Sequence, residues 1–383
     1  MKNLVFLIFF SIVFLIYFSG SWYVFNRGMH ALQQTQYRTL FAWIFWILSF
    51  SFVVGQFLER MSPTLSGKIV TYVGSFWLVT LLYLFLLILS IDIVRLFDHW
   101  FHFIPVVWKN TFLSGKWLFV EVGAIALLVV LAGHINAINP RIERITLPID
   151  KAGSSKKEIK IALVTDIHMG FIIGNHRVSK LVNQINSLNP DLVLFGGDLV
   201  DHNPLPVIKD DMGANFLRLN PPLGKYAITG NHEFIGHPEV SINYLSKFGI
   251  TYLRDTIVNV DNLLLLAGRD DKDKQRFEGK PRKTLSQIMN GTHTDLPLIL
   301  MDHQPVDYVN AEKAGADLMV SGHTHKGQIW PFGYITSKVY ELDWGLLKRN
   351  KTWFYVSSGY GTWGPPVRLG NRPEIVLFTL KLN

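Results

Sequence analysis

Four long apolar stretches occupy the first 140 residues of the chain. Three of them, Leu4–Phe25, Thr39–Leu58 and Ile69–Ile91, contain no charged residue. The fourth, Trp117–Ile138, carries one acid, Glu121, near its start. Each stretch exceeds the roughly 18 residues that mark a membrane-spanning helix, and a helix satisfies its own backbone hydrogen bonds in lipid. The sequence therefore predicts a membrane domain, residues 1–140, with four transmembrane helices.

A cleaved signal peptide is the alternative for the first stretch, but its apolar run is too long and three more stretches follow it. Four spans would place both ends of the membrane domain on one side of the bilayer. Lys and Arg near that side, such as Arg141 and Arg144, slightly outnumber those near the other side. The positive-inside tendency thus favours a multi-pass protein of the cell (inner) membrane whose part after residue 140 is cytoplasmic.

Composition excludes several kinds of site. The chain has 383 residues and no cysteine, so a disulfide framework, a thiolate metal site and a cysteine nucleophile are all excluded. Its net charge of +8 is compatible with a nucleic-acid partner, but no basic run with interleaved aromatic residues occurs. We therefore expect no nucleic acid, and attribute the positive charge to a membrane surface or an anionic substrate.

Short apolar runs alternate with helical patterns from Ile159 onwards, which is typical of an α/β fold. The runs predicted as buried strands are Ile161–Val164, Leu192–Phe195, Tyr226–Thr229, Leu298–Met301 and Leu318–Val320. Residues 141–158, which end in the polar Gly/Ser/Lys stretch Lys151–Glu158, are predicted to be a linker, and residues 159–383 to be the soluble domain. Within it, the charged stretch Arg269–Lys283 is predicted to be a mobile excursion.

Asp, Asn and His residues follow directly after these five apolar runs. They are Asp166 and His168, then Asp198 and Asp201, then Asn231 and His232, then His303, and finally His323 and His325. Open α/β sheets place their sites at the carboxyl ends of strands. Helix capping would explain any one of these residues by itself, but the complete set favours a shared site.

Such a set can bind metal without sulfur, which suits Mn, Fe, Zn or Co. Two divalent cations a few ångströms apart can clamp a phosphoryl group and activate water. His232 directly follows Asn231 in the chain, and an imidazole beside the leaving group would suit a general acid. Asp201 is the obvious carboxylate to orient that imidazole.

The order Asp-x-His, Gly-Asp-x-x-Asp, Gly-Asn-His-Glu, His and Gly-His-x-His, from Asp166 to His325, resembles the calcineurin-like metallophosphoesterase superfamily. The resemblance implies a four-layer α/β/β/α sandwich with a dinuclear site at its strand ends. It implies that one metal ion is held by Asp166, His168, Asp198 and His325. A second ion would share Asp198 and be held by Asn231, His303 and His323. It further implies that His232 is the catalytic acid, paired with Asp201.

Two residues outside this ligand set are candidates for substrate binding. His202 stands where some members, notably the protein phosphatases, have an Arg that grips phosphate, which argues against a phosphoprotein substrate. Arg368, in a Gly/Pro-rich loop, could contact phosphate. The C-terminal segments Tyr355–Gly359 and Pro366–Arg368 resemble the membrane-associated bacterial branch of YkuE- and YaeI-like phosphoesterases, some of which hydrolyse the pyrophosphate of UDP-diacylglucosamine.

We therefore expect a membrane-bound dinuclear-metal phosphoesterase that hydrolyses a phosphate ester or pyrophosphate with metal-activated water. A substrate linked to lipid, such as a UDP-diacylglucosamine-like molecule or a phospholipid, would suit an enzyme anchored in the bilayer. One alternative is a membrane-anchored phosphodiesterase for soluble nucleotides. A more remote alternative is a non-catalytic membrane sensor or scaffold, although no ligand of the motif is missing.

Overall fold

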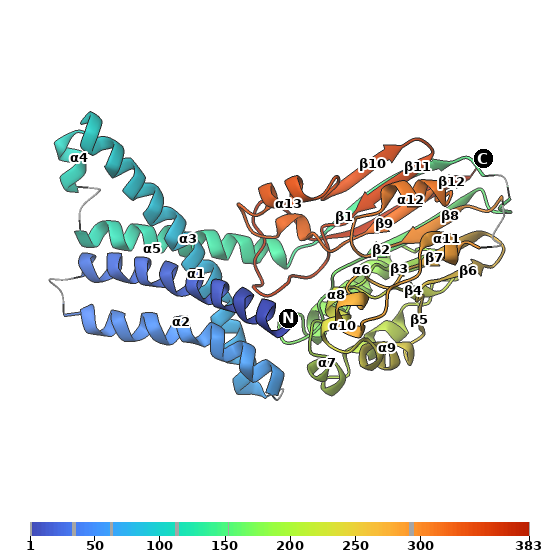
Figure 1. Ribbon diagram of the computed structural model, residues 1–383, viewed down its shortest axis with the longest axis horizontal. Helices are drawn as coiled ribbons and strands as arrows, with labels where there is room; N and C mark the ends of the chain where they lie inside the picture. The colour runs from blue at the N-terminus through green and yellow to red at the C-terminus, as the bar shows by residue number, and fades with distance from the viewer. Residues whose placement is uncertain are drawn as a thin grey trace. The chain divides into compact units, whose positions relative to one another are not determined.

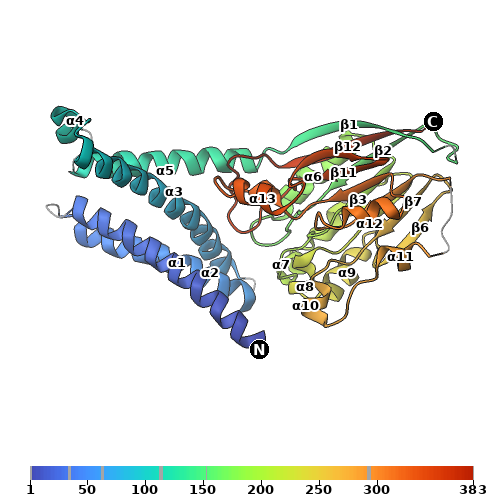
Figure 2. The ribbon, with the colours of Figure 1, turned by 45° about the horizontal axis from the view of Figure 1, so that its top comes forward.

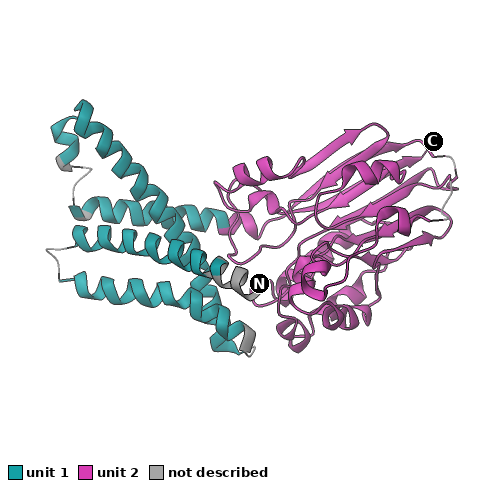
Figure 3. Cartoon of the chain, viewed as in Figure 1, with its two compact units in different colours: residues 1–133 teal, residues 134–383 magenta. Residues whose placement is uncertain are grey.

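The computed structural model describes residues 2–32, 36–61, 64–111, 115–151, 153–290 and 295–382. The chain divides into two compact units, residues 1–133 and residues 134–383 (Figure 3). We call them the helical unit and the catalytic unit.

The helical unit is built from long helices. Its elements are α1 (Lys2–Ala31), α2 (Arg38–Met61), α3 (Leu65–Phe101), α4 (Val106–Thr111) and α5 (Gly115–Ala137), whose last residues belong to the catalytic unit. Among the described residues, three segments are long and apolar enough to cross a membrane: residues 38–59, 65–101 and 117–137. These confirm three of the four predicted spans. Residues 4–25 are helical too, but several side chains there lie outside the described set, so the first span stays a prediction.

Small residues bring α2 and α3 into close contact. A Cβ atom on Gly74 would lie 2.4 Å from the Cα atom of Phe52, and one on Gly55 would lie 2.9 Å from the Cα atom of Thr71. The Thr71 hydroxyl also donates a hydrogen bond to the Gly55 carbonyl at 3.2 Å. Close backbone approach through glycine is a common way for helices to associate in membranes, where the hydrophobic effect does not hold them together.

Two six-stranded sheets form the catalytic unit (Figures 1 and 2). The first has the order β1 (Arg141–Ile149), β12 (Glu374–Leu382), β2 (Glu158–Val164), β3 (Leu192–Phe195), β4 (Lys225–Ala227) and β5 (Ile250–Tyr252). The second has the order β10 (Gly345–Arg349), β11 (Thr352–Val356), β9 (Leu318–Ser321), β8 (Leu298–Met301), β7 (Leu264–Gly268) and β6 (Thr256–Val260).

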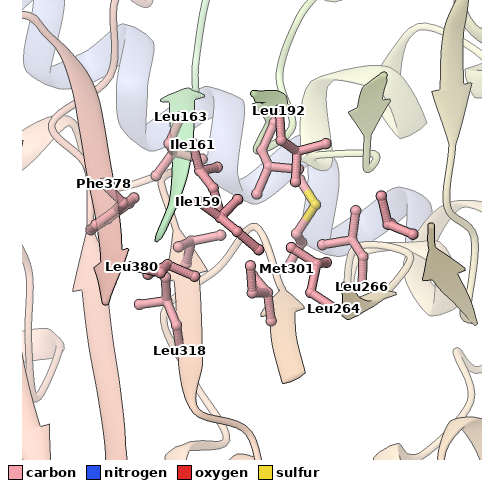
Figure 4. Packing of buried hydrophobic residues seen from close by; sticks show 14 of the residues in the cluster. Ile159, Ile161, Leu163, Leu192, Leu264, Leu266, Met301, Leu318, Phe378 and Leu380 are labelled. Atoms are coloured by element: carbon pink, nitrogen blue, oxygen red, sulfur yellow. The ribbon is translucent and has the colours of Figure 1, made fainter. Parts of the chain in front are cut away.

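The main core lies between the two sheets. Ile161 and Leu163 of β2 and Phe378 of β12 face Leu266 of β7 and Met301 of β8, all of them fully buried (Figure 4). Because both sheets contribute one apolar face to this layer, their relative position is fixed by packing.

Helices cover the outer faces of both sheets. On the first sheet lie α6 (Asn175–Ser187) and the 3₁₀ helix η1 (Met212–Arg218), where Phe195 of β3 meets Phe216 edge-on. On the second sheet, α11 (Leu285–Ile288) and α12 (Tyr308–Lys313) share an apolar cluster with β7, β8 and β9. The predicted four-layer α/β/β/α sandwich is thus confirmed. The remaining elements are α7 (Leu205–Lys209), α8 (Asn231–Ile235), α9 (Pro238–Ser246), α10 (Lys274–Glu278), η2 (His325–Gly327) and α13 (Gly333–Val339).

The linker prediction is wrong for residues 141–149, which form β1. This strand pairs in parallel with β12 along its whole length, from Arg141 beside Glu374 to Ile149 beside Leu382. From Ile145 onwards inward-facing residues alternate with exposed ones: Leu147 and Ile149 are buried in the main core, whereas Thr146 and Pro148 are exposed. Alternation of this kind is what a strand with one buried face requires.

Candidate metal centre

The candidate residues all follow the carboxyl ends of parallel strands, in loops or at the start of a short helix. In the first sheet β2, β3 and β4 are parallel neighbours, and in the second sheet β8 and β9 are. The loop after β2 carries Asp166 and His168, and the loop after β3 carries Asp198 and Asp201; Asn231 and His232 begin α8, shortly after β4. The second sheet contributes His303, His323 and His325 from the segments after β8 and β9. The two sheets thus deliver different halves of the set.

These loops have unusual backbone conformations. Five of the predicted ligands have positive φ angles: Asp166, His168, Asp198, His323 and His325. Non-glycine residues rarely occupy this region, and where they do they often belong to functional sites. Glycines of the motifs allow close approach to the carboxylates. A Cβ atom on Gly230 would lie 2.1 Å from Asp198 Oδ1, and one on Gly322 would lie 2.2 Å from Asp166 Oδ2.

One group of possible ligands consists of Asp166, His168 and His325. All three are buried, and their ligand atoms lie within 4.8 Å of one another. The Nε2 atoms of His168 and His325 are 3.1 Å apart, and His325 Nε2 lies 3.4 Å from Asp166 Oδ1. Two imidazole nitrogens and a carboxylate oxygen therefore converge on one point.

A second group consists of Asp198, His303 and His323, again with ligand atoms within 4.8 Å of one another. His303 Nε2 lies 3.1 Å from Asp198 Oδ2, and Asn231 Oδ1 lies 2.8 Å from His323 Nδ1. Asp198 Oδ2 is also 3.8 Å from His168 Nε2 of the first group. Asp198 therefore stands between the two groups, where a bridging ligand would stand.

The donor set fits divalent cations. His303 Nε2 is buried and makes no hydrogen bond of normal geometry with any described residue. Burial and the charge of His303 lower the pKa of His323 to about 3. Burial, together with electrostatic repulsion from His168 and Arg368, holds the pKa of His325 well below its usual range. These two rings are therefore neutral and can offer lone pairs. Neutral imidazoles and carboxylates are ligands that such metal ions take. The Asp198 carboxylate raises the pKa of His303, so this ring would release its proton when a cation binds.

His232 and Asp201 form a hydrogen-bonded pair beside this centre. His232 Nδ1 lies 2.7 Å from Asp201 Oδ1, and the backbone N–H of His232 donates to Asp198 Oδ1 at 2.8 Å. Burial opposes a charged ring, yet the carboxylates of Asp198 and Asp201 raise the pKa of His232 to about 9. A ring held at Nδ1 in this way leaves Nε2 as the atom that can exchange a proton with a bound molecule.

The two predicted substrate-binding residues have different positions. His202 lies beside the pair just described, with its Nδ1 3.1 Å from Asp201 Oδ1. Arg368 is fully buried, and its guanidinium donates to the carbonyls of Gly359 and Gly361. Its terminal nitrogen lies 3.1 Å from His325 Nδ1. Arg368 therefore supports a candidate ligand from behind. None of it is exposed, and a contact between it and phosphate stays a prediction.

The loop of Arg368 is held by the end of α5. Asn136 Nδ2 donates to the carbonyl oxygens of Arg368 and Asn371, at 2.9 Å and 2.7 Å. His134 Nδ1 lies 2.8 Å from the carbonyl of Pro366. These residues of α5 belong to the catalytic unit. The predicted membrane domain, residues 1–140, includes them.

Glu233 supports the centre and was given no role in the sequence analysis. Its fully buried carboxylate accepts hydrogen bonds from the backbone N–H groups of Asp198, Leu199, Val200 and Gly230, at 2.7–3.1 Å. It thereby joins the loop after β3 to the start of α8. Its place as the third residue of a short helix, where Glu commonly reaches back to the helix start, was the available signal.

We expect Glu233→Gln to weaken the centre, because an amide NH₂ cannot accept hydrogen bonds from backbone N–H groups. Leaving buried donors unpaired should lower the melting temperature by roughly 5 °C and the affinity for metal about tenfold. Thermal unfolding and metal titration of the purified chain measure both effects. Glu239→Gln is the matched control, since the Glu239 side chain is 63% exposed; equal results for the two variants would contradict the supporting role of Glu233.

Comparisons with known proteins identify the family. A family model described as calcineurin-like phosphoesterase matches residues 159–327. An uncharacterized metallophosphoesterase of Aquifex aeolicus is 34% identical over 260 residues, which cover 67% of this chain and 98% of that protein. A transmembrane protein with metallophosphoesterase domain from Danio rerio is 31% identical, over 67% of this chain and 62% of that protein. The uncharacterized metallophosphoesterase YkuE of Bacillus subtilis is 31% identical, over 58% of this chain and 79% of that protein. This membrane-associated chain therefore belongs to the calcineurin-like phosphoesterases, which are metal-dependent hydrolases that use two divalent metal ions.

Proposed function

We propose that this enzyme hydrolyses a phosphate ester or pyrophosphate of a lipid-linked substrate at the bilayer surface. One cation would be held by Asp166, His168, Asp198 and His325, and the other by Asp198, Asn231, His303 and His323. The two groups of converging ligand atoms, with Asp198 between them, support this assignment.

The hydrolysis would depend on the two cations and on the pair of His232 and Asp201. When bound, the two cations would polarise the phosphoryl oxygens and favour attack of water on phosphorus. His232 acts as the general acid and gives the proton on Nε2 to the leaving oxygen. Asp201 accepts the hydrogen bond from Nδ1, 2.7 Å away, and so fixes both the tautomer and the direction of the ring.

A group of exposed apolar side chains, most of them in or next to α13, supports the proposal of a lipid-linked substrate. We call it the α13 patch; its members are Trp330, Phe332, Tyr334, Ile335, Val339 and Trp363, each more than 40% exposed. The ring of Trp363 is 6.5 Å from that of His232, and Tyr340, which follows α13, is 6.2 Å from His323. Exposed apolar patches of this kind mark lipid or ligand contacts, and Trp and Tyr favour the membrane interface.

The substrate class can be tested by removing the apolar side chains of α13. We expect the triple variant Tyr334→Ser, Ile335→Ser, Val339→Ser to lose at least about tenfold in kcat/KM on lipid-linked phosphates in mixed micelles, because it buries less apolar surface with the lipid. Its kcat/KM on a chromogenic phosphate ester should stay within about twofold.

Val240→Ser, which removes an exposed apolar side chain from α9, is the control for the loss of a surface hydrophobe. Equal losses on both substrates would argue against a lipid-binding role of the α13 patch. Efficient hydrolysis of nucleotide diesters that is insensitive to the triple variant would instead favour the phosphodiesterase for soluble nucleotides.

Two further variants distinguish the role of a metal ligand from the role of the general acid. Asp198→Asn should lower metal affinity at least about 100-fold and abolish activity, since Asp198 serves both groups. His232→Ala should keep the metal content of the wild type and lower kcat by about 10²–10⁴-fold. Metal analysis and steady-state kinetics measure these effects, with the exposed His176→Ala as control. Full activity of His232→Ala would assign the acid to another residue.

The proposed location is the inner membrane, with the catalytic unit in the cytoplasm, as the positive-inside tendency supports. Because the chain has no cysteine, a single introduced one is a unique label. In spheroplasts, a membrane-impermeant maleimide should label Gln36→Cys, between the first two spans, and not Ser246→Cys on the catalytic unit. Both positions are exposed, so lysis should make both reactive. The reverse pattern would place the catalytic unit outside.

A further inference from the structure

The helical unit contains a cavity of about 600 Å³, lined by residues of α1, α2, α3 and α5. Most of its wall is apolar and aromatic, as at Phe45 on α2 and Trp77 on α3. The volume lies within the range of about 300–1,000 Å³ that is usual for ligand pockets. All residues of the wall lie between Val24 and Leu127, so the cavity is separate from the phosphoesterase centre.

The charged groups of the wall come from two places in the chain. Arg27 and His30 lie on α1, and Asp92 and Arg95 lie on α3. Asp92 holds them together: it pairs with Arg27 at 2.6 Å and with Arg95 at 3.6 Å, and the Tyr23 hydroxyl donates to it. Arg27 follows the apolar stretch 4–25 closely, and Asp92 follows the stretch 69–91 directly. These charges therefore belong to the level of the lipid headgroups, where apolar spans end.

The balance of these charges favours an anion. The wall carries two guanidinium groups and one carboxylate, so its net charge is positive without counting His30. Guanidinium groups bind phosphate with paired hydrogen bonds, and a carboxylate partner holds the side chain ready for it. A hydrocarbon chain alone would complement only the apolar part of the wall, whereas an anionic amphiphile complements both parts.

The apolar part of the cavity exists because α5 presents a small residue to it. Gly123 belongs to the wall, and a Cβ atom on it would have no described atom within 4 Å. Nearer the start of α5, Phe119 contacts Phe41 of α2 edge-on, with ring centroids 5.4 Å apart. An unfilled apolar space of this size is unfavourable, and in a bilayer the available filler is an acyl chain.

We propose that this cavity binds one anionic phospholipid of the bilayer. Its phosphate lies against Arg27 and Arg95, and an acyl chain extends along Phe45 and Trp77 toward Gly123. The inference does not rest on the substrate proposed above, because the two sites share no residue.

Binding of defined lipids to the full-length chain in detergent tests this site. In native mass spectrometry, phosphatidylglycerol should bind one molecule per chain at least about tenfold more tightly than phosphatidylcholine with the same acyl chains. Arg27→Gln combined with Arg95→Gln should remove this preference. Arg38→Gln, which neutralises an exposed Arg of α2 outside the cavity wall, should retain it.

A second variant tests the apolar part without changing a charge. Gly123→Leu should fill the space and weaken binding of both lipids about tenfold, whereas Gly123→Ala should have a smaller effect. Hydrolysis of a chromogenic ester by each variant shows independently that the catalytic unit is folded. Three outcomes would overturn the proposal: equal binding of the two lipids, binding that is unchanged in both the arginine and the leucine variants, or occupation of the cavity by a second protein chain in place of lipid.

Discussion

The metal centre depends on one buried carboxylate that binds no metal in our assignment. Glu233 accepts backbone hydrogen bonds from the loop after β3 and from Gly230, which precedes α8. Asp198 and Asn231 belong to these two segments, so their separation is set by Glu233. Burial and the charge of Asp198 raise the pKa of Glu233, and the backbone N–H groups act against that rise. A carboxylate in such surroundings is rigid because each oxygen is already engaged.

The other constraint is the packing of the two sheets. The loops of the first sheet supply Asp166, His168, Asp198 and Asn231, whereas His303, His323 and His325 come from the second sheet. No single sheet holds a complete set for either cation. The apolar layer between the sheets, with residues such as Leu163 and Met301, therefore determines distances between ligands that are more than 100 positions apart in the chain.

The sequence predicted the layers and the convergence of the candidate ligands well, because apolar runs that end in Asp, Asn or His mark strand ends directly. It failed where burial depends on distant partners. β1 looked like a linker because its pairing with β12 lies more than 200 positions away. Arg269–Lys283 looked mobile because of its charges, but Arg269 and Arg282 both pair with the buried Asp302, next to His303. Nothing local to the Gly/Pro-rich loop revealed that Arg368 is enclosed.

The contact between Asn136 and the Arg368 loop determines where a truncated version of this protein can begin. A fragment that begins at Arg141 would retain every candidate metal ligand and all twelve strands. It would nevertheless lack the side chain that donates to the carbonyls of Arg368 and Asn371. Since Arg368 reaches His325, such a fragment would have a looser wall behind one ligand. We therefore expect kinetic constants measured on it to differ from those of the intact chain, and a shortened version that keeps these contacts has to begin no later than His134.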